Sequence, residues 1–465
     1  MPRRRDRNPE RQERRRCDFP ELYKQKEMQQ VELIDRILRE ENIKAAIQAV
    51  KSNRGAAGID RMTVDALEEY FSEHGEEIRE QIRIKKYQPQ PVRRVYIPKA
   101  NGKMRPLGIP TVVDRVIQQA VAQIRSQGYE RYFSEFSYGF RPNRDCHMAM
   151  ERVLKYLNSG YEWVVDLDIE KYFDTVNHDK LISILRERIN DAPTLHLIRS
   201  FLKAGVMENG LVSPTEEGVP QGGPLSPVLS NVYLDKLDRE LEGRGLNFVR
   251  YADDCNIFVR SEKAADRVME SITGWLERKL RLRVNATKTK VVRPPDSTFL
   301  GFTFWESKDG WKLKPAEDRK VRLCAKVKEI LCRRKAVAVP LAITFTKLNQ
   351  VIRGWINYFR IGSMKKWLKR EFGPWMRHKV RVVILKQWKR PKTILRNLMI
   401  LRRHLKSVIS PERIKGVANA RQGWYRKAKL PIVSFLISPG ILSLPNKKEN
   451  RPGLIDPLAY YLSIT

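Results

Sequence analysis

The chain has 465 residues, enough for about three domains of ordinary size, and 42% of them are hydrophobic, as in a globular protein with a core. Its 90 Lys and Arg residues exceed the 54 Asp and Glu residues, and the net charge of +36 predicts a polyanionic partner such as nucleic acid. No apolar run approaches the ~18 residues of a membrane span, and the five cysteines include no Cys-x-x-Cys pair. We therefore expect no membrane contact, disulfide framework or structural zinc site, and a cytoplasmic location.

The N-terminal part is predicted to contain a basic arm, helices and one hairpin. Residues 1–25 are rich in Arg and lack the apolar stretch of a signal peptide, so we expect a disordered arm. Residues 31–50 carry apolar side chains at helical spacing, and a Glu-rich helix follows and reaches about residue 84. Residues 89–110 alternate between prolines, which predicts a β-hairpin that turns at Asn101-Gly102.

A strand that leads into a helix is predicted over residues 161–181, YEWVVDLDIEKYFDTVNHDKL. The alternation from Trp163 to Ile169 places Asp166 and Asp168 on one face, with Asp174 on the following helix. A carboxylate at such a strand end projects into a cleft, so Asp166 and Asp168 are candidates for a metal site.

A loop poor in side chains follows at residues 218–227, GVPQGGPLSP, where two glycines come directly after Gln221. Such a loop lets its backbone approach a ligand closely. Ser226 and Pro227 have the pattern of an N-cap and a first helical residue, which predicts a helix to about Glu242.

Two adjacent acids, Asp253 and Asp254, lie between the apolar runs of FVRYADDCNIFVR, residues 248–260. The pattern predicts a hairpin with the acids at its tip, either as a solvated turn or beside a cation, for which oxygen ligands favour magnesium over zinc. Together with a strand-end Asp they would form a two-sided cage for two divalent ions about 3.5–4 Å apart, as phosphoryl transfer requires.

Residues 319–429 are mainly helical by pattern and carry 32 Lys and Arg residues against three acids, a net charge of +29. Five of the nine tryptophans also lie there, and we expect most of them to anchor the core. Because so one-sided a domain repels itself unless phosphates neutralise it, we predict a nucleic-acid surface.

Eight motifs give the chain a resemblance to reverse transcriptases, most closely to those of bacterial group II introns, which also act as splicing maturases. They are, in chain order, NRGAAGIDRMT, IPKANGKMRPLGIPTVVDRVIQQA, FSYGFRPNRD, VVDLDIEKYFDTVNHDKL, GVPQGGPLSPVLSNVYLDKLD, RYADDCNIFV, KTKVV and FLGFTF. Two further segments, LNQVIRGWINYF and RQGWYRKAKLPIV, resemble the thumb and maturase domain, so the resemblance runs from about residue 41 to 431. It implies an α+β fold with the right-hand architecture of fingers, palm and thumb.

The resemblance also implies a division of the chain. Its parts would be an arm (1–25), N-terminal extension helices of the fingers (26–90), fingers (91–160), palm (161–310), a helical, strongly basic thumb/maturase domain (311–430) and a C-terminal tail (431–465). Because no Cys follows Cys332 and no His follows His404, we expect no HNH endonuclease domain.

Carried over by position, the resemblance assigns a site for two Mg²⁺ ions, with Mn²⁺ as the alternative metal. Asp168, the backbone carbonyl of Ile169, and Asp253 would be the ligands, and Asp254 would support the site. Asp166 is the rival to Asp168 and is taken to be structural.

The family's nucleotide contacts fall on further residues of this chain. Lys99 and Arg105 would clamp the triphosphate, with Lys103 open to confusion with either, and Gln221 would lie against the dNTP and the template. Phe173 would exclude a 2′-hydroxyl, unless it is simply a core residue. Lys288, with Lys290 as its rival, would protonate the leaving pyrophosphate.

The function implied is that of an RNA-directed DNA polymerase that extends a DNA or RNA primer on an RNA template. It would also bind its group II intron RNA as a splicing maturase and act on target DNA in intron mobility, in a bacterial cytoplasm. Two alternatives stay open: a splicing factor with an inactive polymerase, and a domesticated enzyme of repair or defence.

Overall fold

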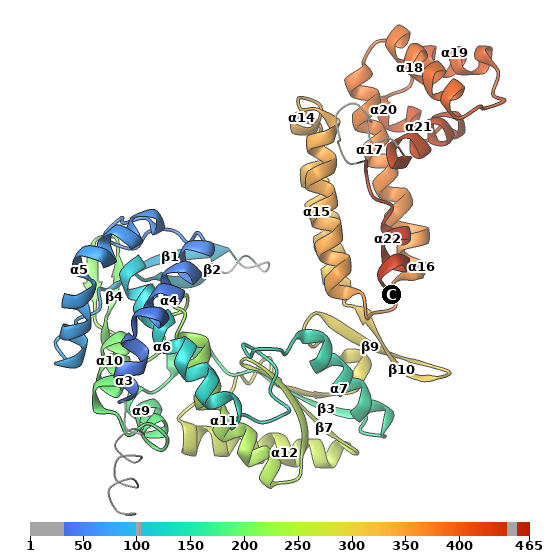
Figure 1. Cartoon of the computed structure of the whole chain (residues 1–465). Helices are drawn as coiled ribbons and strands as arrows, with labels where there is room; N and C mark the ends of the chain where they lie inside the picture. The colour runs from blue at the N-terminus through green and yellow to red at the C-terminus, as the bar shows by residue number, and fades with distance from the viewer. Residues whose placement is uncertain (1–31, 99–101, 103, 444–452) are drawn as a thin grey trace, which may run out of the picture. The chain divides into compact units, whose positions relative to one another are not determined.

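The computed structural model describes residues 32–98, 102, 104–443 and 453–465 (Figure 1). The arm predicted over residues 1–25, and also Lys99, Asn101 and Lys103, lie outside the described residues. The chain divides into two compact units: the first unit is Met1–Tyr156 with Trp163–Val291, and the second unit is Leu157–Glu162 with Val292–Thr465.

Helices begin the first unit. The helix predicted over residues 31–50 is two helices, α3 (Leu33–Leu38) and α4 (Glu40–Ser52), because Arg39 between them has an extended ψ of 141°. α4 packs on α6 (Val112–Glu130), and the Glu-rich helix α5 (Leu67–Arg83) ends where the sequence predicts.

A small sheet follows the helices, with the order β2-β1-β4-β5. The predicted hairpin is present as β1 (Val92–Pro98) and β2 (Met104–Ile109), paired antiparallel from Arg93↔Ile109 to Pro98↔Met104. β4 (Val206–Glu208) pairs parallel to β1, and β5 (Leu211–Ser213) pairs antiparallel to β4.

A second sheet, with the order β6-β7-β3-β8, carries the predicted acids. Its strands are β3 (Trp163–Leu167), β6 (Asn247–Tyr251), β7 (Asp254–Val259) and β8 (Lys290–Val292). α11 (Ser226–Gly243) packs on β6, and α12 (Glu262–Trp275) packs on β3 and β7. By register, Val165, Phe248 and Ile257 share one face of the sheet and are buried, so Asp166 points to the opposite face.

Four more helices complete the first unit, as far as the structure describes it. They are α7 (Cys146–Asn158), α8 (Tyr172–Thr175), α9 (His178–Arg186) and α10 (Ala192–Lys203), with single turns of 3₁₀ and π helix at Val64–Ala66 and Leu276–Leu280.

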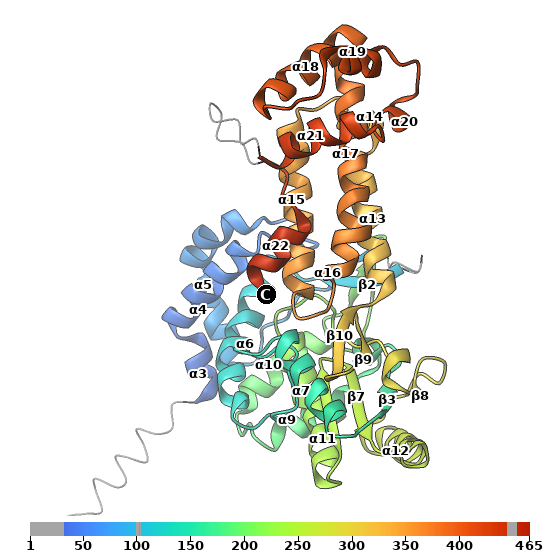
Figure 2. The same cartoon turned by 90° about the vertical axis from the view of Figure 1, so that its right-hand side faces the viewer.

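The second unit is a β-hairpin followed by helices. The strands β9 (Phe302–Ser307) and β10 (Gly310–Pro315) pair antiparallel. The helices are α13 (Glu317–Ile330), α14 (Arg333–Ala336), α15 (Leu341–Phe359), α16 (Lys365–Trp367), α17 (Gly373–Trp388), α18 (Pro391–His404), α19 (Pro411–Asn419), α20 (Trp424–Lys427), α21 (Pro431–Ser443) and α22 (Pro457–Ile464), with short turns at Pro294–Asp296 and Leu368–Phe372. Figure 2 shows α18, α19 and α21 gathered at one end of α17, and α22 packs on α15.

An aromatic cluster supports these long helices. Trp367 contacts Trp355 at 5.5 Å and Phe372 at 5.0 Å between ring centroids, and Phe372 contacts Trp375 at 6.0 Å. These three tryptophans are partly buried and pack on one another and on the buried Phe372, and the core role of the five tryptophans stays a prediction. The α+β class predicted from the sequence is confirmed, and no helix within the described residues is both long and apolar enough to cross a bilayer.

Candidate active site

Strand pairing brings three of the predicted acids to one face of the second sheet. β3 and β7 pair antiparallel, with Asp166 opposite Asn256 and Leu167 opposite Cys255. Asp168 follows Leu167 and Asp254 precedes Cys255, so extension of this register by one residue would place them opposite each other, and the charge of Asp168 acts on Asp254. Because directly opposed residues of an antiparallel pair share a face, the carboxylates of residues 166, 168 and 254 belong to the same side.

The predicted hairpin of β6 and β7 is present and closes through a turn of two residues. Tyr251 pairs with Asp254, so Ala252 and Asp253 form the turn. Ala252 has a φ of +60°, the left-handed conformation that the tightest hairpin turns need. A Cβ on Gly139 would lie 2.3 Å from the Ala252 nitrogen, so only glycine lets that neighbouring loop reach the turn.

The acids repel one another. The pKa of Asp254 is raised to about 6, first by desolvation and then by the charges of Asp253, Asp166 and Asp168. Because Asp254 as a whole residue is exposed to solvent, we attribute its raised pKa mainly to the charges of the neighbouring acids. Burial raises the pKa of Asp166 to about 6, and the nearby Lys290 opposes that rise. Such a cluster favours a bound cation.

An ammonium group already lies on one of these acids. Lys288 donates to both carboxylate oxygens of Asp168, at 3.0 and 2.8 Å, while 63% of its own side chain remains exposed. The backbone of Asp168 is fixed by the Asn285 N–H, which donates to its carbonyl at 2.9 Å, and by its own N–H, which donates to Thr289 Oγ1 at 3.1 Å. Of the two rival lysines, Lys288 therefore contacts Asp168, whereas Lys290 acts on Asp166.

The chemistry of this donor set fits a hard divalent cation. Its expected ligands are two carboxylates, of Asp168 and Asp253, and the carbonyl of Ile169, all oxygen atoms. In the part of the chain that the structure describes, no three His, Cys, Asp or Glu side chains cluster closely enough to hold a metal ion. A set with only two carboxylates does not need such a trio, and the mutual repulsion at Asp254 indicates an excess of negative charge.

A pocket of about 320 Å³ lies between the first sheet and α8. Phe173 and Asp174 line it from α8, and Gln221 lines it from the glycine loop. Phe173 is only 9% exposed, and its carbonyl accepts a hydrogen bond from the Val219 N–H at 2.6 Å. Phe173 is therefore both a core residue and a wall of the pocket.

Gln221 joins the elements around this pocket. Arg105 Nε donates to Gln221 Oε1 at 3.0 Å, and Gln221 Nε2 donates to Asp174 Oδ1 at 3.4 Å. The backbone N–H of Gly108 donates to the Gln221 carbonyl at 2.7 Å, which ties the loop to β2. A Cβ on Gly223 would lie 2.2 Å from Gln118 Oε1, so this glycine allows the close packing. The structure thus brings Arg105 and Gln221 together, while Lys99 lies outside the described residues.

Two details differ from the sequence analysis. Ser226 is not an N-cap: α11 begins at Ser226, and its hydroxyl donates to the Pro220 carbonyl at 2.6 Å, so it holds the glycine loop instead of a helix end. Asp174 had no role in the sequence-based prediction, although an acid directly after the aromatic Phe173 was a visible signal. Here it accepts from Gln221 inside the pocket.

Part of the positive charge of the second unit is structural. Lys427 is buried and donates to the Ala418 carbonyl at 2.9 Å, near the end of α19. Arg381 is also buried and donates through Nε to the Ala428 carbonyl at 2.9 Å, just past α20. These cations satisfy helix C-terminal carbonyls, where positive charge is favourable. They are therefore not part of the surface predicted to meet phosphates.

Two family models match this chain. Residues 97–304 match the family described as reverse transcriptase (RNA-dependent DNA polymerase), and residues 321–404 match the maturase-specific domain of group II introns. The chain is 36% identical over 310 residues to the protein YkfC of Escherichia coli, which covers 58% of this chain and 81% of YkfC. It is 43% identical over 206 residues to the group II intron-encoded protein LtrA of Lactococcus lactis, which covers 44% of this chain but only 34% of LtrA.

A solved structure, a partial Cas6-RT-Cas1–Cas2 complex, is 25% identical, covers 53% of this chain and 43% of its own, and has a TM-score of 0.35, too low to add to the argument. The reverse transcriptase match, the maturase-specific match and the similarity to LtrA point to the same family. The chain belongs to the group II intron-encoded reverse transcriptases, RNA-directed DNA polymerases of the right-hand fold that also carry a maturase domain.

Proposed function

We propose that the protein copies RNA into DNA with two Mg²⁺ ions, or Mn²⁺ in their place, held by Asp168, Asp253 and the carbonyl of Ile169. The β3–β7 register supports this proposal most, because its extension by one residue would bring Asp168 opposite the turn that carries Asp253 and Asp254. When bound, the ions would activate the attacking primer hydroxyl and stabilise the leaving oxygen. Asp254 supports the site through the negative charge that it adds beside the ligands.

The pocket lined by Phe173 and Gln221 is proposed to receive the dNTP. Its cationic neighbour Arg105, together with Lys99, would bind the triphosphate, and Gln221 would orient the nucleotide against the template. The ring of Phe173 would leave no room for a 2′-hydroxyl, so the pocket would select dNTP over NTP.

Lys288 is proposed as the proton donor to the leaving pyrophosphate. Its ammonium lies on Asp168, within reach of the metal ligands, and its exposed side chain can turn toward an incoming phosphate. General acids of this kind raise a rate by about 10²–10⁴-fold.

We also propose that the second unit binds the parent group II intron RNA as a splicing maturase, and that the protein uses target DNA during intron mobility. The match of residues 321–404 to the maturase-specific domain and the net charge of +29 over residues 319–429 support this. From the same family resemblance, we also propose a division of the chain. Residues 26–160 would form the fingers with their N-terminal extension, 161–310 the palm, 311–430 the thumb and 431–465 the tail.

Primer extension tests the proposal. The wild-type chain should extend a DNA or RNA primer on an RNA template with Mg²⁺, and Asp253→Asn should abolish extension while RNA binding in a filter or gel assay stays within about twofold, because the lost charge lies in the metal site. Extension that survives in Asp253→Asn would show that the metal ligands are assigned wrongly.

A further inference from the structure

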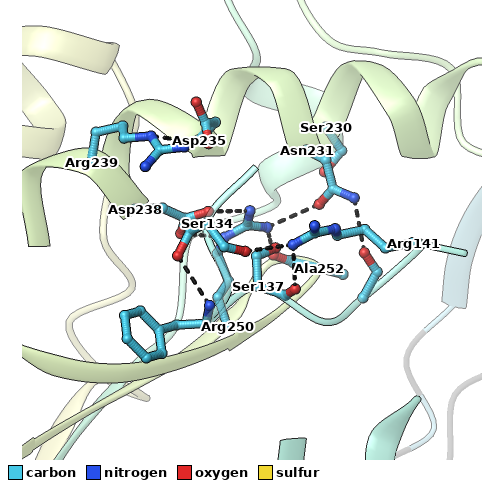
Figure 3. Close-up of polar contacts among 12 residues, drawn as sticks. Ser134, Ser137, Arg141, Ser230, Asn231, Asp235, Asp238, Arg239, Arg250 and Ala252 are labelled. Carbon is cyan, nitrogen blue, oxygen red and sulfur yellow. Dashed lines mark hydrogen bonds and ion pairs between the residues drawn. The ribbon is translucent and has the colours of Figure 1, made fainter. Parts of the chain in front are cut away.

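A fully buried guanidinium lies behind the turn that carries Asp253. Arg250 on β6 and Asp238 on α11 are both 0% exposed. Arg250 Nε donates to Asp238 Oδ1 at 2.7 Å and Nη2 donates to Oδ2 at 2.6 Å, a bidentate pair that links the two elements (Figure 3).

The third nitrogen of the guanidinium reaches the turn itself. Nη1 donates to the Ala252 carbonyl at 2.9 Å and to Asn231 Oδ1 at 3.0 Å. Ala252 is the first residue of the turn and holds the positive φ, and Asp253 follows it directly. One side chain thus connects α11 with the peptide that precedes Asp253.

The same network holds the neighbouring loop. Asn231 Nδ2 donates to the Gly139 carbonyl at 2.8 Å, and Gly139 is the residue packed against Ala252. The backbone of Arg250 also pairs with this loop: its N–H donates to the Phe136 carbonyl at 3.0 Å, and its carbonyl accepts from the Tyr138 N–H at 2.9 Å. The turn is therefore bounded by fixed groups on two sides.

Stability alone does not account for this pair. Replacement of a buried ion pair by well-packed apolar residues of similar volume is often neutral or stabilising. An apolar pair, however, has no donor for the Ala252 carbonyl. It also has no guanidinium that binds α11 and the turn at the same time. Arg250 therefore fixes the position of the turn, which a Met in its place could not do.

We propose that Arg250 and Asp238 are positioning residues that fix the Ala252–Asp253 turn relative to Asp168. The inference rests on the proposed role of Asp253 as a metal ligand and adds the source of its placement. Because α11 begins at the end of the glycine loop, the pair also couples the metal site to the loop that holds Gln221. A misplacement of about 1 Å in a reacting group can lower a rate by about 10²-fold.

The double variant Arg250→Met/Asp238→Leu separates position from stability. We expect the variant to fold with a melting temperature close to that of the wild type, because the gain from replacing a buried ion pair offsets the loss of the donor to Ala252 and Asn231. Its KM for dNTP should stay within about twofold, and its kcat should fall by about 10²-fold. Without primer or nucleotide, titration with Mn²⁺ followed by electron paramagnetic resonance should show binding about 10- to 100-fold weaker than in the wild type, and Asp253→Asn should also weaken it.

The matched control is an ion pair on the same helix. Lys236, two residues before Asp238, binds Glu187 at 2.5 Å, and both side chains are partly exposed and do not contact the turn. Lys236→Met/Glu187→Leu should keep the wild-type kcat and Mn²⁺ affinity. If the Arg250 double variant does not fold, Arg250→Lys replaces it: the charge beside Asp238 remains, but one ammonium cannot reach all three acceptors, so the same losses are expected.

The outcomes are distinct. A folded variant at Arg250 with wild-type kcat and Mn²⁺ affinity would overturn the positioning role. A wild-type protein that binds Mn²⁺ but extends no primer would refute the proposed polymerase function instead, while weaker Mn²⁺ binding by the Arg250 variant would still support the positioning role.

Discussion

Replacement of Phe173 by valine tests the proposed selection against ribonucleotides. The ring contacts Tyr172 edge-to-face at 5.2 Å between centroids and is 9% exposed, yet it also lines the 320 Å³ pocket. Truncation to alanine would cost about 3–5 kcal/mol of stability, as for a core phenylalanine. Valine keeps part of the buried volume and still opens the pocket wall, so it is the better substitution.

The expected effect follows from the size of the contact. A steric pocket contact contributes about 1–3 kcal/mol of discrimination. Its loss corresponds to a fall of about 5- to 150-fold in the ratio of kcat/KM for dNTP over NTP. Single-nucleotide extension on an RNA template measures this ratio, with dNTP and NTP offered opposite the same template base, and thermal melting confirms that the variant is folded.

Phe201→Val provides the control for the buried volume that is lost. Phe201 on α10 is 5% exposed and packs near Tyr87, at 6.4 Å between centroids, and it does not line the pocket. Its truncation should lower the melting temperature by a similar amount and leave selectivity unchanged. A folded Phe173→Val with wild-type selectivity would remove Phe173 from the sugar site, and an equal loss in both variants would show that selectivity merely follows stability.

Local patterns predicted most of the secondary structure. The β6–β7 hairpin and α11 lie where alternation and the Pro-containing helix start place them, because neighbours within a few residues decide such elements. One error is at an element end, where the strand expected to reach Ile169 stops at Leu167; another is a break at Arg39 in the middle of the predicted N-terminal helix. The Ser226 hydroxyl, which the pattern predicts to cap the helix, donates to the Pro220 carbonyl instead.

The sequence could not predict contacts between residues that lie far apart in the chain. Lys288 and Asp168 are 120 residues apart, and Arg105 and Gln221 are 116 apart. Lys288 and Lys290 fit the motif equally well in the sequence. Only the folded structure shows that Lys288 contacts Asp168, whereas Lys290 acts on Asp166. Arg250 carried a weak signal, a cation inside an apolar strand run, but its partner on a helix could not be read from spacing.

Three further predictions follow from the contacts described. Lys288→Ala should lower kcat by about 10²–10⁴-fold in single-turnover extension, and Lys290→Ala should lower it much less; equal effects would contradict the assignment. Burial lowers the pKa of His178, whose Nε2 lies 2.7 Å from the Gly218 carbonyl, so the unfolded chain takes up the proton first and the melting temperature should fall as pH drops below about 6.5. His178→Gln should flatten that dependence between pH 6.5 and 5, and an unchanged slope would contradict it. For RNA binding by the second unit, the exposed Lys326 and Lys328 should contribute to the salt dependence, whereas the buried Lys427 should not.

The last of these separates surface charge from structural charge. Each phosphate contact contributes about −0.9 to the slope of log affinity against log salt for a duplex. Lys326→Gln/Lys328→Gln should therefore flatten the slope by up to about 1.8, while Lys427→Met, which removes a donor to a helix carbonyl, should lower the melting temperature and leave the slope alone. The titration should compare the intron RNA with an unrelated structured RNA of equal length. Shape and 2′-hydroxyl contacts do not fade with salt as charge does, so a maturase should still prefer its intron at high salt. Loss of both RNAs together would refute the maturase proposal and leave the polymerase proposal untouched.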